Sequence, residues 1–146
     1  MTNEIVLVDT TVWIHFLRGS GTSIEEKLVP LIISDRLATS PVIIMEILRG
    51  AKTKKDYDKL HEDLSALRCF DTSGEIWERA FELAYTLRKN GLNVPLTDTL
   101  IAALAIENKT LLLHDDRHYE MIASVVKLRH ERLSPTTSPS PPPPSI

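Results

Sequence analysis

The chain has one cysteine, no long apolar run and no excess of basic residues, and each of these scarcities narrows the class of protein. Cys69 is the single thiol among 146 residues, so no internal disulfide can form. Because it stands in the apolar stretch 67–70, we expect a buried or half-buried thiol in a reducing compartment, the cytoplasm. No apolar run approaches the roughly 18 residues of a membrane span. Met1 to Glu4 are polar and include an acid, which is not typical of a signal peptide.

Acids outnumber bases, which gives a formal net charge of -3 at pH 7. Domains that bind nucleic acid tightly and without sequence preference are usually basic, so the charge argues weakly against that class. A negative balance also arises when acids gather in one metal site, where bound cations neutralise them. The composition is otherwise that of an ordinary soluble domain, with 42% hydrophobic and 25% charged residues.

Apolar strand-like segments alternate with amphipathic segments along residues 1–133. This alternation predicts a single α/β domain with a parallel sheet. Ser23 and Glu26 have the spacing of a capping box, and Pro30 predicts a kink or an early end to the helix that follows. Ser40 and Pro41 predict the start of another helix. The expected strands are 5–8, 36–39, 68–70, 110–113 and 125–128; the expected helices are 12–17, 23–33, 41–49, 53–67, 73–89, 97–107 and 119–124.

The last residues, 134–146, are rich in serine and proline, and Ile146 is the single apolar side chain among them. Such a segment cannot bury a core, so we expect a disordered tail, partly in polyproline conformation. A docking role for this tail is open, and a dispensable extension is the simpler interpretation.

Carboxylates occur at positions where apolar residues would be expected. Asp9 ends the first apolar strand, where ligands of open α/β sheets bind, although it could also cap the next helix. Glu46 is surrounded by apolar residues within its helix, where an unpartnered carboxylate would be costly to bury. The alternative is that Glu46 lies on a narrow wet face.

Two further acidic positions follow the same pattern. Asp98 continues the small apolar face of its helix, formed by residues three, four and seven positions later, although an acid in the first turn also complements the helix dipole. Asp115 and Asp116 follow a second strand, and one of them could be a turn residue. Converging acids repel one another unless cations hold them together, and Mg²⁺ and Mn²⁺ prefer oxygen-rich sites. A phosphodiester attacked by metal-activated water is the natural substrate of such a site.

Four segments in this order resemble the PIN-domain ribonucleases, and most closely the VapC-type toxins of toxin–antitoxin pairs. They cover residues 4 to about 130: VDTTVWI from Val8, MEILRGA from Met45, LTDTLIAA from Leu96 and LHDDRHYE from Leu113. The resemblance implies a PIN-like three-layer fold with a central parallel sheet of four to five strands flanked by helices. It also implies Mg²⁺- or Mn²⁺-dependent endonucleolytic cleavage of RNA, a homodimer and a cognate antitoxin.

Carried over position by position, the resemblance assigns the metal-binding acids to Asp9, Glu46, Asp98 and Asp116. Asp116 matches rather than Asp115 because the family's aspartate stands three residues before an aromatic, here Tyr119. Thr10 occupies a position where small polar residues assist the acids.

The resemblance also draws attention to two histidines. His114 stands where many members have threonine or serine, and His118 where many have a further aspartate. Either could orient water or phosphate, or be an ordinary junction residue. Basic residues near the acids are candidates for contacts to the RNA backbone, although 52–55 could be a solvated helix face: Arg18, Arg49, Lys52, Lys54, Lys55 and Arg117.

Metal-dependent phosphatases and receiver domains also place aspartates at strand ends. Phosphatases of this type require a second aspartate two residues after the first. This chain has Thr11 at that position, which argues against the class. Receiver domains require a lysine at the end of a late strand, and no lysine occurs in residues 111–116. A PIN-like nuclease outside a toxin–antitoxin pair, or a non-catalytic PIN-like binding domain, stays open as an alternative.

Overall fold

The computed structural model describes residues 3–135, so most of the expected tail lies outside the described residues. Its centre is a parallel sheet of five strands in the order β3-β2-β1-β4-β5. The strands are β1 (Val6–Val8), β2 (Leu37–Thr39), β3 (Arg68–Cys69), β4 (Leu111–His114) and β5 (His130–Arg132). The α/β fold and parallel sheet predicted from the sequence are thereby confirmed.

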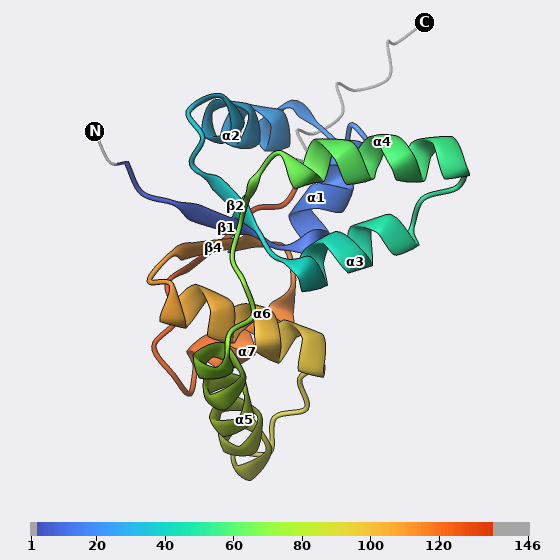
Figure 1. Ribbon diagram of the computed structural model, residues 1–146. Coiled ribbons are helices and arrows are strands. Elements are labelled where there is room, and N and C mark those ends of the chain that lie inside the picture. The colour runs from blue at the N-terminus through green and yellow to red at the C-terminus, as the bar shows by residue number, and fades with distance from the viewer. Residues whose placement is uncertain (1–2, 136–146) are drawn as a thin grey trace, which may run out of the picture.

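Helices cover both faces of the sheet, which gives three layers (Figure 1). The first four helices lie on one side, with α1 packed against both α2 and α3, and α3 against α4. The last three lie on the other side, where α6 packs between α5 and α7. Their bounds are α1 (Thr10–Leu17), α2 (Thr22–Ile33), α3 (Pro41–Arg49), α4 (Lys54–Ser65), α5 (Gly74–Lys89), α6 (Leu96–Glu107) and α7 (Arg117–Ala123).

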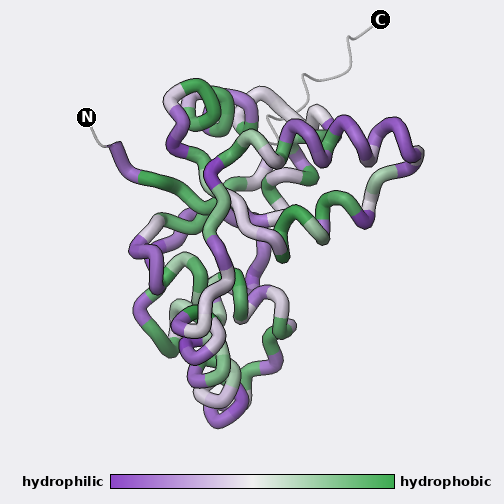
Figure 2. The backbone as a smooth tube through the Cα atoms, viewed as in Figure 1, coloured by the Kyte–Doolittle hydropathy of each residue, from purple (hydrophilic) through white to green (hydrophobic). Residues whose placement is uncertain are grey.

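The core is built on the two central strands, which are apolar on both faces because helices cover both. Leu7, Val8, Leu112 and Leu113 are completely buried. Helix α6 is similarly enclosed, with every side chain from Thr99 to Ala105 buried. Figure 2 shows the contrast between these hydrophobic elements and the hydrophilic helix α4. Within residues 3–135, no helix is both long enough and apolar enough to cross a membrane.

The last strand does not lie where the sequence predicted it. Val125 and Val126 both donate their backbone N–H to Ile122 O, so 125–128 continues the turn after α7 instead of forming a strand. The strand is β5, whose His130 pairs with Leu112 of β4. The valines suggested a strand by propensity, but the chain needs these residues to return from the end of α7 to the sheet edge.

Helix α2 differs from its predicted start. The N-cap is Gly21 and the helix begins at Thr22, so Ser23 is already helical and the capping-box prediction is wrong. Pro30 neither ends nor shortens the helix, which continues to Ile33. Pro30 and Glu26 are both exposed, so the Glu26 carbonyl that loses its helical partner can bond to water.

Two apolar side chains are exposed, and the sequence predicted burial for one of them, Cys69. Cys69 lies on β3, an edge strand of two residues whose burial pattern is exposed throughout, so the expected burial of its thiol is wrong. Trp77 shares helical spacing with the apolar face of α5 but is 45% exposed.

Candidate active site

The four predicted acids come from four elements that meet at the carboxyl edge of the sheet. Strands β1 and β4 are parallel neighbours, so Asp9 after β1 and Asp116 after β4 emerge at the same edge. Asp9 N–H extends the pairing by donating to Leu113 O over 2.9 Å. Helix α3 carries Glu46, and the first turn of α6 carries Asp98. These two helices contact each other, which closes the group.

Asp9 is held in place by donors on both of its oxygens. Oδ2 accepts from Thr11 N at 3.1 Å and from Thr11 Oγ1 at 2.6 Å, and Oδ1 accepts from the Tyr119 hydroxyl at 2.6 Å. The side chain caps α1 and is 2% exposed. The capping role considered from the sequence is confirmed, and Asp9 also lies close enough to Asp98 and Glu46 for its charge to raise their pKa values.

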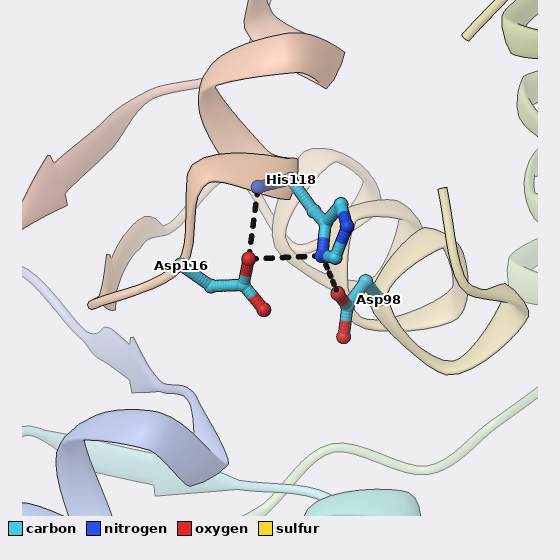
Figure 3. A group of neighbouring side chains, drawn as sticks. All are labelled: Asp98, Asp116 and His118. Atoms are coloured by element: carbon cyan, nitrogen blue, oxygen red, sulfur yellow. Dashed lines mark hydrogen bonds and ion pairs between the residues drawn. The ribbon is translucent and has the colours of Figure 1, made fainter. Parts of the chain in front are cut away.

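Asp98 and Asp116 face each other across His118 (Figure 3). Nδ1 of His118 lies 3.1 Å from Asp98 Oδ2 and 2.9 Å from Asp116 Oδ1. Asp116 also caps α7 by accepting the backbone N–H of His118 at 2.9 Å. One ligand atom from each of the three residues lies within 4.8 Å of the others, a spacing that could hold a metal ion.

Glu46 joins the group through Thr10. The Thr10 hydroxyl donates to Glu46 Oε1 over 3.0 Å, which links α1 to α3 beside Asp9. Burial raises the pKa of Glu46, the Thr10 hydrogen bond opposes that rise, and the charge of Asp9 adds to it. Because Thr10 follows Asp9 directly in the chain, this hydrogen bond places Glu46 near Asp9.

The pKa values of Asp9 and Asp98 are both raised. Burial is the main cause for Asp9, opposed by its hydrogen bonds from Thr11 and Tyr119. Burial, then the charges of Asp116 and Asp9, raise the pKa of Asp98 to about 7. For Asp116, burial is outweighed by the backbone and side chain of His118, and its pKa is lowered. A cation placed among these groups would favour their ionised forms.

The remaining predicted residues have different surroundings. His114 is fully buried: its Nδ1 accepts the Asp116 N–H at 3.2 Å, and its Nε2 lies 2.9 Å from His130 Nδ1. Burial and then His130 lower the pKa of His114 to about 4, so it is neutral and supports the Asp116 backbone. Arg49 lies close enough to lower the pKa of Glu46. Arg117 is exposed on α7, and among residues 3–135 no described contact joins it to the acids.

The basic residues near Glu46 divide into two groups. Arg18 and Lys52 line a groove between α1, α3 and α4 that contains Glu46 and has a volume of about 670 Å³. Lys54 instead forms an ion pair with Asp58 at 2.9 Å on the exposed face of α4. The groove also includes Lys59, which the sequence did not single out.

Two residues of the site had no assigned role in the sequence. The sequence gives Tyr119 no role beyond marking the position of Asp116, yet its hydroxyl contacts Asp9 and lies 3.5 Å from Asp98. Thr11 fixes Asp9 and also accepts the Asp115 N–H at 2.9 Å, which ties α1 to the loop after β4. An aspartate followed two residues later by a hydroxyl is a helix-capping signal that could have indicated Thr11. No local pattern indicates that a tyrosine 110 residues away would reach Asp9.

Comparison with known proteins identifies this arrangement. The PIN domain family model matches residues 6–125. VapC ribonuclease Mb1587 of Mycobacterium bovis is 30% identical over 129 residues, which cover 86% of this chain and 96% of that protein. Ribonuclease VapC18 of Mycobacterium tuberculosis is 27% identical over 125 residues, covering 83% and 89%. The structure of VapBC2 from Rickettsia felis, bound to a DNA fragment from its promoter, has a TM-score of 0.76 at 22% identity and covers 89% of this chain and 99% of that one.

The fold and the acidic edge define an α/β domain of the PIN type. The chain therefore belongs to the PIN-domain family, and within it to the VapC ribonucleases. The resemblance found in the sequence is confirmed.

Proposed function

We propose that the chain is an endoribonuclease of the toxin class, which hydrolyses RNA with a divalent cation held by Asp9, Glu46, Asp98 and Asp116. The observation that carries the proposal is the gathering of four carboxylates at one edge of the sheet, of which Asp98 and Asp116 lie within metal-ligand spacing together with His118. Burial, and then the charges of Asp116 and Asp9, raise the pKa of Asp98 to about 7. Relatives at 27 to 30% identity are named ribonucleases. Mg²⁺ and Mn²⁺ fit this oxygen-rich set of donors.

The bound cation and the residues around the acids would have different roles in the reaction. When bound, the cation supplies a Lewis acid that lowers the pKa of water and offsets charge developing on the phosphate oxygens. Thr11 and Tyr119 fix the orientation of Asp9, and Thr10 fixes that of Glu46. The arrangement needs no side chain as a covalent nucleophile.

We propose that the RNA backbone follows the groove that contains Glu46. Arg18, Lys52 and Lys59 line it and provide phosphate contacts beside the acids. The same lining carries Glu46, Asp56 and Asp63, and Lys59 lies 3.6 Å from Asp63, so Arg18 and Lys52 are the main candidates for phosphate contacts. Arg49 and Arg117 could add contacts at the rim of the site.

The expected protein partners are a cognate antitoxin and a second copy of the chain. Structural neighbours include VapBC from Salmonella typhimurium bound to DNA and a toxin–antitoxin complex from Klebsiella pneumoniae. Helix α5 presents a row of aromatic side chains that suits a protein interface, namely Trp77, Phe81 and Tyr85, each 45 to 64% exposed. We propose that the nuclease domain comprises residues 1–133 and acts in the cytoplasm.

Cleavage of RNA by the purified protein tests the enzyme. We expect Mg²⁺ or Mn²⁺ to support cleavage, EDTA to stop it, and both Asp9→Asn and Asp98→Asn to abolish it in protein that remains folded by circular dichroism. Full activity in both variants would overturn the site assignment. RNA binding without cleavage in every metal would support the non-catalytic alternative.

The toxin role needs a separate test. A short reading frame directly upstream, encoding a protein with a DNA-binding domain, would supply the antitoxin. Co-expression of that protein should relieve growth arrest caused by this chain. If no such neighbour exists and expression is harmless, an RNA-processing nuclease becomes the better description.

A further inference from the structure

One nitrogen atom at the site is buried, points at two carboxylates and makes no aligned hydrogen bond. It is Nδ1 of His118, 3.1 Å from Asp98 Oδ2 and 2.9 Å from Asp116 Oδ1. Figure 3 shows the imidazole placed between the two acids, with Nδ1 toward both. Buried polar atoms normally make well-aligned hydrogen bonds, so two close but poorly aligned contacts at a functional site call for an explanation, such as an ion shared by the nitrogen and both carboxylates.

We propose that His118 is itself a metal ligand through Nδ1, together with Asp98 and Asp116, and that this nitrogen shifts the preference of the site from Mg²⁺ toward Mn²⁺. The inference rests on the proposed metal-dependent function and adds a ligand to it. His118 occupies a position where the resemblance leads one to expect an aspartate, so the chain would differ from its relatives in metal chemistry.

The distances agree with neighbouring ligands around one ion. Metal–ligand bonds of about 2.1 Å at right angles place adjacent ligand atoms about 3.0 Å apart. The two contacts of Nδ1 are 3.1 and 2.9 Å, and one ligand atom of each residue lies within 4.8 Å of the others. The three donors therefore need little rearrangement to surround a single cation.

The start of helix α7 orients the imidazole. The backbone N–H of His118 donates to Asp116 Oδ1 at 2.9 Å, so the residue is fixed in the capped first turn. Its side chain is 24% exposed, and the two acids beside it are 13% and 24% exposed. Oriented, partly buried donors of this kind bind metal with less loss of conformational freedom.

A protonated imidazole paired with the two acids is the alternative explanation of the same contacts. In that case His118 would be a substitute for the metal, and a cation would have to displace it. The two explanations predict opposite effects of removing the ring. A ligand strengthens metal binding, whereas a competing cation weakens it.

The donor atom also determines which metal ion the site binds more tightly. Imidazole nitrogen suits first-row transition metals, whereas Mg²⁺ prefers carboxylate, carbonyl and water oxygens. The ratio of Mg²⁺ to Mn²⁺ dissociation constants is therefore the informative quantity. We expect it to fall when His118 is replaced by alanine, and to fall as well when the replacement is aspartate.

The test is metal binding to the full-length protein in the absence of RNA. Mn²⁺ affinity is measured by electron paramagnetic resonance, and Mg²⁺ affinity by competition, for wild type, His118→Ala, His118→Asp and Asp98→Asn. His61→Ala is the matched control, because it removes an imidazole from α4. We expect His118→Ala to weaken Mn²⁺ binding about tenfold or more, and Mg²⁺ binding less, with His61→Ala unchanged.

A spectroscopic signature identifies the ligand directly. Pulsed electron paramagnetic resonance of the Mn²⁺ complex should show coupling to a ¹⁴N nucleus in the wild type and in His61→Ala, but not in His118→Asp. Unchanged or tighter Mn²⁺ binding in His118→Ala, or no nitrogen coupling in the wild type, overturns the proposal.

The same measurements separate this proposal from the proposed function. If Asp98→Asn abolishes Mn²⁺ binding while His118→Ala does not weaken it, the nuclease site stands and only the His118 assignment fails. If the wild type binds no divalent cation, both are overturned. Thermal unfolding of each variant identifies any loss of fold.

Discussion

The hydroxyl of Tyr119 donates a 2.6 Å hydrogen bond to Oδ1 of Asp9, joining two residues that are 110 positions apart in the chain. Tyr119 is completely buried, and burial followed by the charges of Asp9 and Asp98 raises its pKa well above the ordinary value. The phenol therefore remains protonated and acts as a fixed donor. It keeps Asp9 oriented, and the same hydroxyl lies 3.5 Å from Asp98 Oδ1.

Tyr119→Phe should weaken divalent-metal affinity and lower kcat by about tenfold, because groups that orient a metal ligand have effects of this size. The ring still fills its place in the core, so the KM for RNA should change little. Isothermal titration with Mn²⁺ and cleavage kinetics measure the two effects. Tyr57→Phe, on α4, is the control. A Tyr119→Phe protein that only unfolds more easily would show that the hydroxyl is purely structural.

Substitutions of Asp115 and of Asp116 should have different effects, the first on the stability of the fold and the second on metal binding. Asp115 accepts from His15 at 2.7 Å, Arg132 at 3.0 Å and Ser134 at 2.8 Å, so it connects α1 to the segment around β5. Asp115→Asn should therefore lower the free energy of unfolding by about 1 kcal/mol while leaving Mn²⁺ affinity in place.

Asp116→Asn is the matched variant and should abolish Mn²⁺ binding. Chemical denaturation and titration on the same samples give both quantities. The assignment of Asp116 over its neighbour would be wrong if Asp115→Asn were the variant that lost the metal.

The stability of the metal-free protein should fall as the pH rises toward 7. Asp98 has a pKa of about 7 in the folded protein, against an ordinary value of 3.8. Between these values the folded state binds a proton that the unfolded state has released, so the slope of unfolding free energy with pH is negative. Denaturation in EDTA at pH 5, 6, 7 and 8 measures this slope.

Asp98→Asn removes the titrating group and should flatten that pH dependence. Mn²⁺ added at pH 7.5 should restore stability to the wild type, because the ion binds the folded state alone. An equal slope in the wild type and Asp98→Asn would mean that another group holds the proton.

Local patterns in the sequence correctly predicted features that depend on neighbouring residues alone, such as the burial of a strand or the start of a helix. Leu7 and Val8 indicated a strand buried on both faces, and the structure buries both completely. Ser40 and Pro41 indicated the start of α3, which begins at Pro41. By contrast, 125–128 looked like a strand but forms the connection to β5, because the position of a short edge strand depends on its partner and not on its own composition.

The sequence by itself determined the α/β class and the family and supplied the proposal of four acids, because each of these depends on short segments and their order. It could not determine how those acids are held. Asp9 depends on a hydroxyl from α7, Glu46 on one from α1, and Asp98 on a histidine from α7. Only the tertiary structure brings these donors together, since hydrogen bonds act over about 3 Å and the chain must fold before such distances exist.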